Sequence, residues 1–431
     1  MATLVNHSSA SPTGGAPCRH LFVTSIRVEP VQLAERVPPA PAAVWLHRGD
    51  GFLAVGGACE LTATGASRFE SLSEQFQRLA LASTVDDRAG LRGSGLICFG
   101  SFSYADSSSR PSRLLIPEAV LATSGADAFL TVISASPITD AQLDVDHWFP
   151  ITSAPSQGVV VAVEPAHTPD EYQALVDAAV ARIRSSDAEK LVISERLEVQ
   201  LDAPLSRAVL TRRLADMFPM TWVYAVADVI GASPEMLVET HGTRLFSRVL
   251  AGTRPVADGQ ELSEQERAAF HADPKERAEH EFAIRSVTEP LTAVTAWIDA
   301  PAAPFVLRLP GLEHLASDVQ AELLPGRTSV DIAGLLHPSA AVSGTPKAAA
   351  NRINAQIEET DRGGYAAPVG WMNGRGDGEW AIALRMAHIV DDQHLTLQAG
   401  GGIVDGSHAL TEHAEVLAKT RPMMRALRGD R

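Results

Sequence analysis

The stretch GGYAAPVGWMNGRGDGEWAIALRMAHIV, residues 363–390, decides the fold class of this chain. Apolar residues on both sides flank a turn rich in Gly, Asn and Asp, residues 373–378. Turn residues of this kind between two apolar runs are typical of a β-hairpin, so we expect strands over residues 363–372 and 379–390. The C-terminal part of the chain therefore contains antiparallel sheet.

The second strand of this hairpin carries a candidate anion-binding residue. Alternation along the strand places Trp380 and Ile382 on one face and Arg385 on the other, among alanines. An arginine with free space around it can hold a planar carboxylate through two hydrogen bonds. A strand-edge arginine paired with a surface acid fits the same pattern equally well.

Outward from the hairpin, the remaining elements mix sheet and helix. Short apolar runs between Gly, Ser and Pro turns make residues 46–150 look like sheet with few helices. Thr168-Pro-Asp-Glu171 is a capping box, and apolar residues at helical spacing follow it. We expect helices over residues 168–186, 273–287 and 407–427, and strands over residues 95–100, 190–194, 221–238 (two strands about Gly231) and 395–399.

Composition bounds the class of protein and its partners. The chain has 431 residues, 45% of them hydrophobic, which is enough for a sizeable core. Its formal net charge of −16 opposes binding to nucleic acid or to an anionic membrane. No apolar run approaches the ~18 residues that a membrane span needs. A small anionic substrate would therefore need local positive charge, from Arg, Lys or a metal ion.

The cysteines and the N-terminus indicate a cytoplasmic protein. Cys18, Cys59 and Cys98 form no C-x-x-C spacing and cannot all pair, so we expect them to be reduced. The N-terminus lacks the basic start and apolar block of a secretory signal. We expect a poorly patterned tail over residues 1–45, a sheet-rich part over 46–165, and a catalytic region over 166–431 in the same domain.

Two predicted helices carry acidic residues three positions apart. Glu276 and Glu279 lie on one face of the first, and Glu412 and Glu415 on one face of the last, with Lys419 four residues further on. Carboxylates that converge from two helices suit a hard cation such as Mg²⁺. Because charged helix faces are common, either pair alone is more often solvated surface.

Two further features permit chemistry but do not require it. Lys190 begins an apolar strand, where partial desolvation could lower its pKa enough for it to act as a base; most lysines are simply exposed. Gly400-Gly-Gly402 after the strand 395–399 lets the backbone approach a ligand, or is only a turn. The sequence has no phosphate-binding G-x-x-x-x-G-K-[ST] loop and no zinc-binding H-E-x-x-H spacing.

Taken together and in this order, several strings resemble the chorismate-utilising enzymes, which include isochorismate, salicylate, anthranilate and aminodeoxychorismate synthases. The resemblance spans about residues 171–427. Its strings are Lys190-Leu-Val-Ile-Ser194, Gly231-Ala-Ser-Pro-Glu235, Leu250-Ala-Gly-Thr-Arg-Pro255, Asp273-Pro-Lys-Glu-Arg-Ala-Glu-His280, Leu336-His-Pro338 with Ser343-Gly-Thr-Pro346, Tyr365–Trp371, Gly376-Asp-Gly-Glu-Trp380 with Arg385, and Ala399–Val404 followed by Glu412, Glu415 and Lys419. It implies an α/β (α+β) fold: a single large domain with two packed β-sheets, helices outside, and the cleft between them.

The resemblance also implies roles for the metal and substrate sites. Glu279 and Glu415 resemble direct Mg²⁺ ligands, with Glu276 and Glu412 holding metal-bound waters. Arg385, Tyr365 and the backbone at Gly402 resemble the clamp on the enolpyruvyl carboxylate of chorismate. The remaining substrate-binding positions implied are Lys419, a further positive charge, together with Gly252, Thr253, Ala341 and His314, the last of which could equally be a satisfied core histidine.

Single residues separate the members of the family. Lys190 resembles the base that activates water for attack at C2, whereas ammonia-using anthranilate synthases have Gln there. Ala251 stands where aminodeoxychorismate synthases place a nucleophilic Lys. Glu235 resembles the general acid that protonates the leaving C4 hydroxyl, although alone it would read as a surface acid after a Ser-Pro turn. Ala341 favours stopping at isochorismate, because salicylate synthases resemble one another in having Thr nearby.

The activity implied is the Mg²⁺-dependent isomerisation of chorismate to isochorismate. The product could feed a catechol siderophore through 2,3-dihydroxybenzoate, salicylate or menaquinone, and the resemblance favours the catechol route. Three alternatives stay open. The chain could be a salicylate synthase that goes on to eliminate pyruvate, an inactive chorismate-binding regulatory homologue, or a subunit that takes ammonia from a partner. The resemblance implies no glutaminase partner and a monomer.

Overall fold

The computed structural model describes residues 18–152, 155–186, 188–256, 262–309, 312–358 and 360–430. Within them, thirteen strands form one large sheet, with a short β19 (Gly344–Thr345) paired to β11. Its main path runs β10 (Val160–Pro165), β11 (Lys190–Leu201), β23 (His394–Ile403), β22 (Met386–Ile389), β13 (Val229–Ser233), β12 (Trp222–Val226), β2 (Ala43–His47), β3 (Asp50–Val55), β8 (Ala119–Ser124), β9 (Asp127–Ser134), β1 (Phe22–Arg27) and β5 (Thr84–Asp87).

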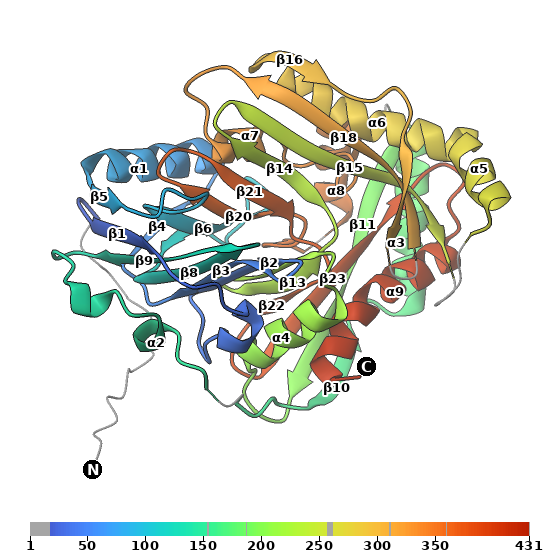
Figure 1. The fold of residues 1–431 in the computed structure, drawn as a ribbon. Coiled ribbons are helices and arrows are strands. Elements are labelled where there is room, and N and C mark those ends of the chain that lie inside the picture. The colour runs from blue at the N-terminus through green and yellow to red at the C-terminus, as the bar shows by residue number, and fades with distance from the viewer. Residues whose placement is uncertain are drawn as a thin grey trace.

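Ten strands form the second sheet within the same described residues, with β17 (Phe305–Leu309) paired to β18 off the main path. The path runs β16 (Thr295–Asp299), β18 (Leu312–Leu323), β15 (Arg244–Pro255), β14 (Met236–His241), β21 (Gly378–Ile382), β20 (Pro368–Asn373), β6 (Ile97–Ser101), β7 (Ser112–Ile116) and β4 (Cys59–Ala63). Both sheets mix segments from the two ends of the chain, so neither half could complete a sheet alone (Figure 1).

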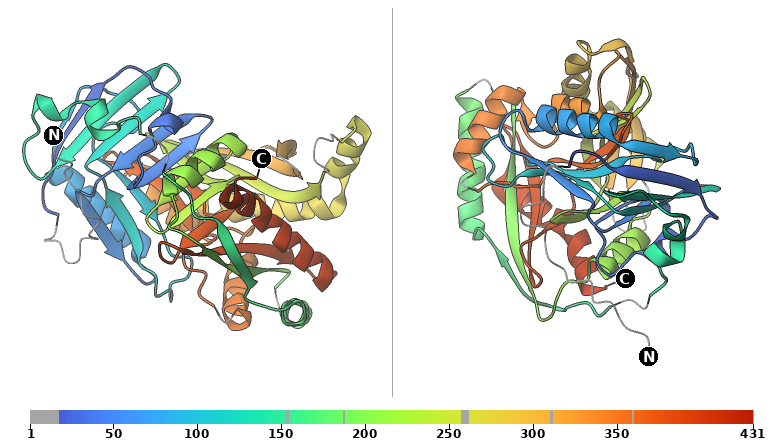
Figure 2. Two further views of the ribbon diagram at one scale, coloured as in Figure 1. Left: turned by 90° about the horizontal axis from the view of Figure 1, so that it is seen from below. Right: turned by 90° about the vertical axis from the view of Figure 1, so that its left-hand side faces the viewer.

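Helices cover the outer faces of the two sheets (Figures 1 and 2). The helix α6 (Pro274–Leu291) packs on β15 and β18, and α9 (Ala409–Arg428) packs on β23. The other helices are α1 (Arg68–Ala82), α2 (Val145–Trp148), α3 (Pro169–Arg184), α4 (Arg207–Met217), α5 (Glu264–Ala272), α7 (Ser329–Leu336) and α8 (Lys347–Ile357). The predicted α/β class, one domain of two packed sheets with helices outside, is confirmed.

The main core lies between the sheets and is aromatic. Trp45, Phe99, Trp371 and Trp380 are almost fully buried in one cluster. A second cluster lies under α4 and α9, and a third under α3 and α8. Burying one side chain of this size stabilises the folded state by roughly 1.5–3 kcal/mol. Together these residues hold the two sheets face to face.

Several predicted elements are confirmed and others need correction. The capping box at Thr168 is present, with the Thr168 and Glu171 side chains each bonded to the other's backbone N–H. Three strands, not two, lie in the region expected over 221–238, because the chain breaks twice. One break is a turn at Ala227, which adopts a φ of 54°, and the other lies between β13 and β14. The glycines Gly400-Gly-Gly402 lie inside β23, not after it. The helix α1 and the strand β1 were not predicted.

The second strand of the hairpin was predicted wrongly beyond Ile382. The turn and the pairing of β20 with β21 are confirmed, but β21 ends at Ile382 and β22 joins the other sheet. Arg385 lies in the break with a φ of 48°, so the alternation of a strand does not apply to it. Glu235 lies at a matching break between β13 and β14. Arg385 and Glu235 thus mark neighbouring points where the chain crosses between sheets.

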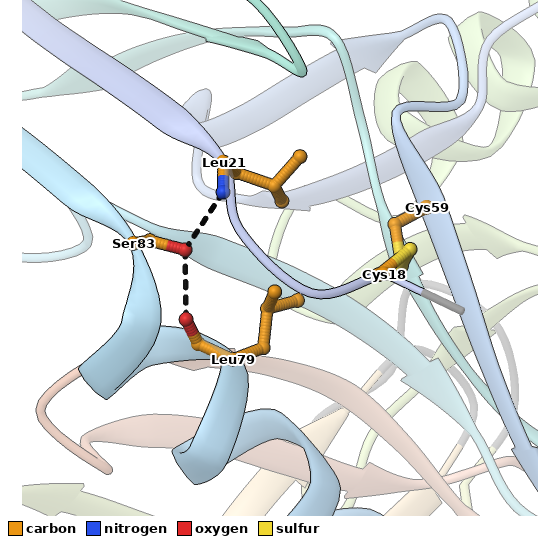
Figure 3. The surroundings of a disulfide bond; sticks show 5 residues. All are labelled: Cys18, Leu21, Cys59, Leu79 and Ser83. Carbon is orange, nitrogen blue, oxygen red and sulfur yellow. Dashed lines mark hydrogen bonds between the residues drawn. A yellow bond between two sulfur atoms is a disulfide. The ribbon is translucent and has the colours of Figure 1, made fainter. Parts of the chain in front are cut away.

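The expectation of three reduced cysteines was wrong for two of them. Cys18 and Cys59 form a disulfide with a Cα–Cα distance of 6.2 Å, and Cys98 is free and buried. Figure 3 shows the bond beside Leu21, whose N–H donates to Ser83 Oγ. Sequence spacing could not reveal this pair because the fold brings the segment before β1 onto β4. In the part of the chain that the structure describes, no helix is long and apolar enough to span a membrane.

Candidate active site

The two crossing points lie next to one another. Ile382 N donates to the Glu235 carbonyl at 3.1 Å, and Ala232 N donates to the Arg385 carbonyl at 3.2 Å. The Ser233 hydroxyl links the two crossing segments, because it donates a hydrogen bond to the Ile382 carbonyl at 2.6 Å. The chain passes from one sheet to the other at both points, so Glu235 and Arg385 lie outside the strands of either sheet.

Lys190 lies over the glycine-rich part of β23. Val192 pairs with Gly402 in the antiparallel register of β11 and β23. A Cβ at Gly402 would lie 2.7 Å from Lys190 Cε, so only glycine leaves room for this side chain. The Lys190 side chain is 15% exposed, and its Nζ lies 2.5 Å from Glu279 Oε1 on α6. The predicted base is therefore partly desolvated and paired with a predicted metal ligand.

Glu235 combines partial burial with an unusual pKa. Burial raises the pKa of Glu235 to about 8, and the positive charge of Lys190 offsets part of that effect. Lys190 is thus near enough to act on Glu235 electrostatically. A cavity, here called the acid cavity, is lined by Glu235, Ala341, Ser339 and residues of β14, β15 and α6. Glu235 is therefore a carboxylic acid that keeps its proton near neutral pH, rather than an exposed surface acid.

A second group gathers around Arg385. Its Nη1 donates to the Lys419 carbonyl at 3.0 Å. Burial lowers the pKa of Arg385, while Tyr365 and Glu415 act against that shift. Lys419 Nζ lies 2.8 Å from Glu415 Oε1 and donates to the Gly400 carbonyl at 2.9 Å. The predicted carboxylate clamp and its neighbouring cation thus lie together.

Tyr365 completes this group from the segment before β20. Its side chain is buried, and a Cβ at Gly400 would lie 3.0 Å from its hydroxyl. Burial raises the pKa of Tyr365, so the phenol stays protonated and can donate a hydrogen bond. Together with Arg385 it can hold an anion that β23 approaches with backbone alone.

His314 belongs to the same site. The pKa of His314 is lowered to about 4, mainly by burial and also by the charges of Arg385 and Lys419, while Glu279 and the Gly252 backbone act in the opposite direction. His314 is therefore neutral at pH 7 and can accept or donate a hydrogen bond without adding charge. Its strand β18 pairs with β15, where Thr253 lies opposite His314. The Thr253 side chain is outside what the structure describes.

Two of the four predicted metal ligands face glycine backbone, Glu276 from α6 and Glu412 from α9. A Cβ at Gly252 would lie 3.2 Å from Glu276 Oε2, and one at Gly401 would lie 3.6 Å from Glu412 Oε2. Glu279 Oε1 lies 2.5 Å from Lys190 Nζ, and Glu415 Oε1 lies 2.8 Å from Lys419 Nζ, so each of these carboxylates already lies beside a basic group. This all-oxygen donor set suits Mg²⁺.

Over the described residues, no three acidic, His or Cys side chains converge closely enough to cage a metal. Mg²⁺ is usually held by one or two carboxylates together with waters and substrate oxygens, so a closed protein cage is not needed. A magnesium site built on these carboxylates would therefore be an open one, completed by waters and substrate oxygens.

One buried ion pair in the site's framework was missed by the sequence analysis. Arg362 and Glu358 are 2% and 8% exposed, with Nε 2.6 Å from Oε2. Arg362 also donates to the carbonyls of Val192 and Val342, at 2.6 and 2.8 Å. It therefore joins the Lys190 strand to the segment carrying Ala341. The sequence signal that could have revealed this ion pair is a Glu and an Arg four residues apart, at the end of a helix and shortly before Tyr365.

Comparisons with known proteins agree with this site. The family of chorismate binding enzymes matches residues 27–428. The isochorismate synthase DhbC of Bacillus subtilis is 33% identical over 278 residues, 62% of this chain and 69% of that protein. Anthranilate synthase component 1 of Streptomyces coelicolor is 36% identical over 273 residues, 61% of this chain and 52% of that protein. The chain belongs to the chorismate-binding enzyme family.

A solved structure also has a similar fold. A Bacillus anthracis structure described as a 2,3-dihydroxybenzoate-specific isochorismate synthase, DhbC, has a TM-score of 0.74 and 26% identity, and the match covers 92% of this chain and 98% of that one. The chain is therefore similar to isochorismate synthases in both sequence and fold.

Proposed function

We propose that this chain is an isochorismate synthase, which converts chorismate to isochorismate by adding water at C2 and releasing the C4 hydroxyl. The observation that carries the proposal is the electrostatic interaction between Lys190 and the buried carboxyl group of Glu235. A partly desolvated amine and a carboxylic acid with a pKa near 8 are electrostatically coupled at the edge of one site. An ammonia-using enzyme would not need a base of this kind.

The site residues form two groups, one that binds the substrate and one that transfers protons. Arg385 and Tyr365 bind a carboxylate of the substrate, and β23 approaches it through glycine backbone. Lys190 accepts a proton from the attacking water. Glu235 gives its proton to the C4 hydroxyl, which leaves as water. Each transfer contributes roughly 10²–10⁴-fold to the rate.

Mg²⁺ is proposed as the cofactor. Glu279 and Glu415 would hold it, with Glu276 and Glu412 beside them, and bound Mg²⁺ neutralises negative charge on the substrate carboxylate. The local cations Arg385, Lys419 and Mg²⁺ would let a doubly negative substrate enter a protein of net charge −16.

The test is turnover of chorismate in the presence of Mg²⁺, with isochorismate and pyruvate quantified separately. We expect isochorismate without stoichiometric pyruvate, and no dependence on ammonia. Stoichiometric pyruvate would assign a salicylate synthase, and binding without turnover would assign a regulatory homologue. Lys190→Ala and Glu235→Gln should abolish turnover while chorismate binding, measured by calorimetry, remains. A folded Glu235→Gln variant with the kcat of the unsubstituted chain contradicts the acid role.

We propose supply of isochorismate to 2,3-dihydroxybenzoate, since a similar solved structure is described as specific for that route. Loss of the gene should then remove secreted catechols, whereas loss of menaquinone would redirect the proposal. We also propose a cytoplasmic monomer without a glutaminase partner. The disulfide removes reduced cysteines as an argument for that location.

A further inference from the structure

The acid cavity is bordered by β15 and by α6, the helix that also carries the proposed metal ligands Glu276 and Glu279. Ala283 and Ser286 line it, four and seven residues beyond Glu279 on the same side of α6. Arg248 lines it from β15, and this side chain is 27% exposed and paired with Asp318 at 2.7 Å. The cavity thus borders Glu235 at one end and a residue in contact with solvent at another.

Among the described residues, one serine hydroxyl that lines this cavity has no hydrogen-bond partner. The other two serines that line it are satisfied, since Ser247 donates to the Leu237 carbonyl at 2.6 Å and Ser286 donates to the Ala283 carbonyl at 2.7 Å. The hydroxyl of Ser339 is buried and lacks a hydrogen-bond partner among the described residues. A buried hydroxyl left unpaired costs roughly 1–3 kcal/mol, so such groups normally bind an ordered water.

The position of Ser339 is well fixed by its backbone. Its carbonyl accepts hydrogen bonds from Val342 N at 3.2 Å and from Ser343 N at 3.1 Å. The turn that these bonds close carries Ala341, which lines the same cavity. The segment that carries Ala341 therefore fixes Ser339 in the wall of the cavity that Glu235 also lines.

We propose that the acid cavity holds an ordered water, bound by the Ser339 hydroxyl, through which Glu235 regains its proton from solvent after each turnover. The inference rests on the proposed function. When Glu235 protonates the leaving group, the C4–O bond breaks, a water molecule forms, and Glu235 remains as a carboxylate. The cavity water then gives a proton to Glu235 and takes one from solvent. The proton lost by the attacking water goes to solvent, so the cycle balances.

Ser339 is thus a positioning residue, and its loss should slow proton return without affecting substrate binding. We expect Ser339→Ala to lower kcat by about 3- to 10-fold, the effect of one hydrogen bond, and to leave KM unchanged. The solvent deuterium isotope effect on kcat should rise, because proton return becomes rate-limiting. Ser339→Thr keeps the hydroxyl and should restore both kcat and the isotope effect. Equal melting temperatures exclude a folding defect.

The outcomes separate this inference from the proposed function. An unsubstituted chain that forms no isochorismate overturns both. An active chain whose Ser339→Ala variant keeps its kcat, or loses kcat without a larger isotope effect, overturns the water relay alone. A crystal structure of the substrate-free protein should show water within hydrogen-bond distance of Ser339 Oγ, and an empty cavity there overturns the relay independently of any activity.

Discussion

Lys190 on β11 and Glu279 on α6 form an ion pair at 2.5 Å, although 89 residues separate them in the sequence. The pair joins the proposed base to a proposed metal ligand. Substitution of Glu279 therefore removes a carboxylate from the metal site and the partner of Lys190 at once. The chemistry of the base and the occupancy of the metal site are linked through this contact.

Loss of Glu279 should weaken activation by Mg²⁺. We expect Glu279→Ala to raise the Mg²⁺ concentration for half-maximal activity by at least about tenfold, since even outer-shell substitutions cost 10- to 100-fold in metal affinity. Glu281→Ala is the matched control, because Glu281 is an exposed glutamate two residues further along α6. An unchanged Mg²⁺ titration for Glu279→Ala would remove Glu279 from the ligand set.

The activity should fall at alkaline pH because of Glu235. The folded-state pKa of about 8 lies above the ordinary value of 4.5, so the group is protonated below pH 8 and loses its proton as pH rises through 8. Since a general acid must carry its proton, kcat/KM should decline above about pH 8. A pH profile of kcat/KM checks this limb. An alkaline limb at the same pH in a Glu235→Gln variant with residual activity would assign it to another group.

The absence of a side chain at Gly402 should be necessary for catalysis but not for folding. An alanine Cβ there would lie 2.7 Å from Lys190 Cε, the mobile end of a side chain, so Lys190 must move while the backbone need not. We expect Gly402→Ala to lower kcat by about 10- to 100-fold, as displaced catalytic groups do. Gly406→Ala is the control, because a Cβ at Gly406 meets no atom within 4 Å. Comparable losses in both variants would contradict the steric argument.

The buried Arg362–Glu358 pair should be important for stability. Arg362→Ala leaves a buried carboxylate without its partner, and we expect the free energy of unfolding to fall by about 3–5 kcal/mol. Arg184→Ala, which removes an exposed ion pair with Asp405, should cost less than about 1 kcal/mol. Urea denaturation followed by fluorescence compares the two. Similar losses would mean that burial does not set the strength of the Arg362 pair.

Local sequence signals predicted the elements that carry the site but not the paths between them. The capping box at Thr168 and the turn before Gly378 have short-range causes, a cap and a set of turn residues, and both are present. Arg385 was expected on a strand of alternating residues, yet the chain leaves that strand at Ile382. Local periodicity cannot register such a crossing, because the two strands involved have similar composition and differ only in their partners.

What the sequence alone determined is chemical: which residue types are present, at which spacing, and that two acidic helices, one arginine and one lysine suit a small anion and a divalent cation. Tertiary structure alone decided that Lys190 lies against Glu279, that Glu235 is buried enough to keep its proton, and that Cys18 reaches Cys59. The reason is that burial, pairing and pKa depend on neighbours brought in from distant parts of the chain. Only the packed sheets supply those neighbours.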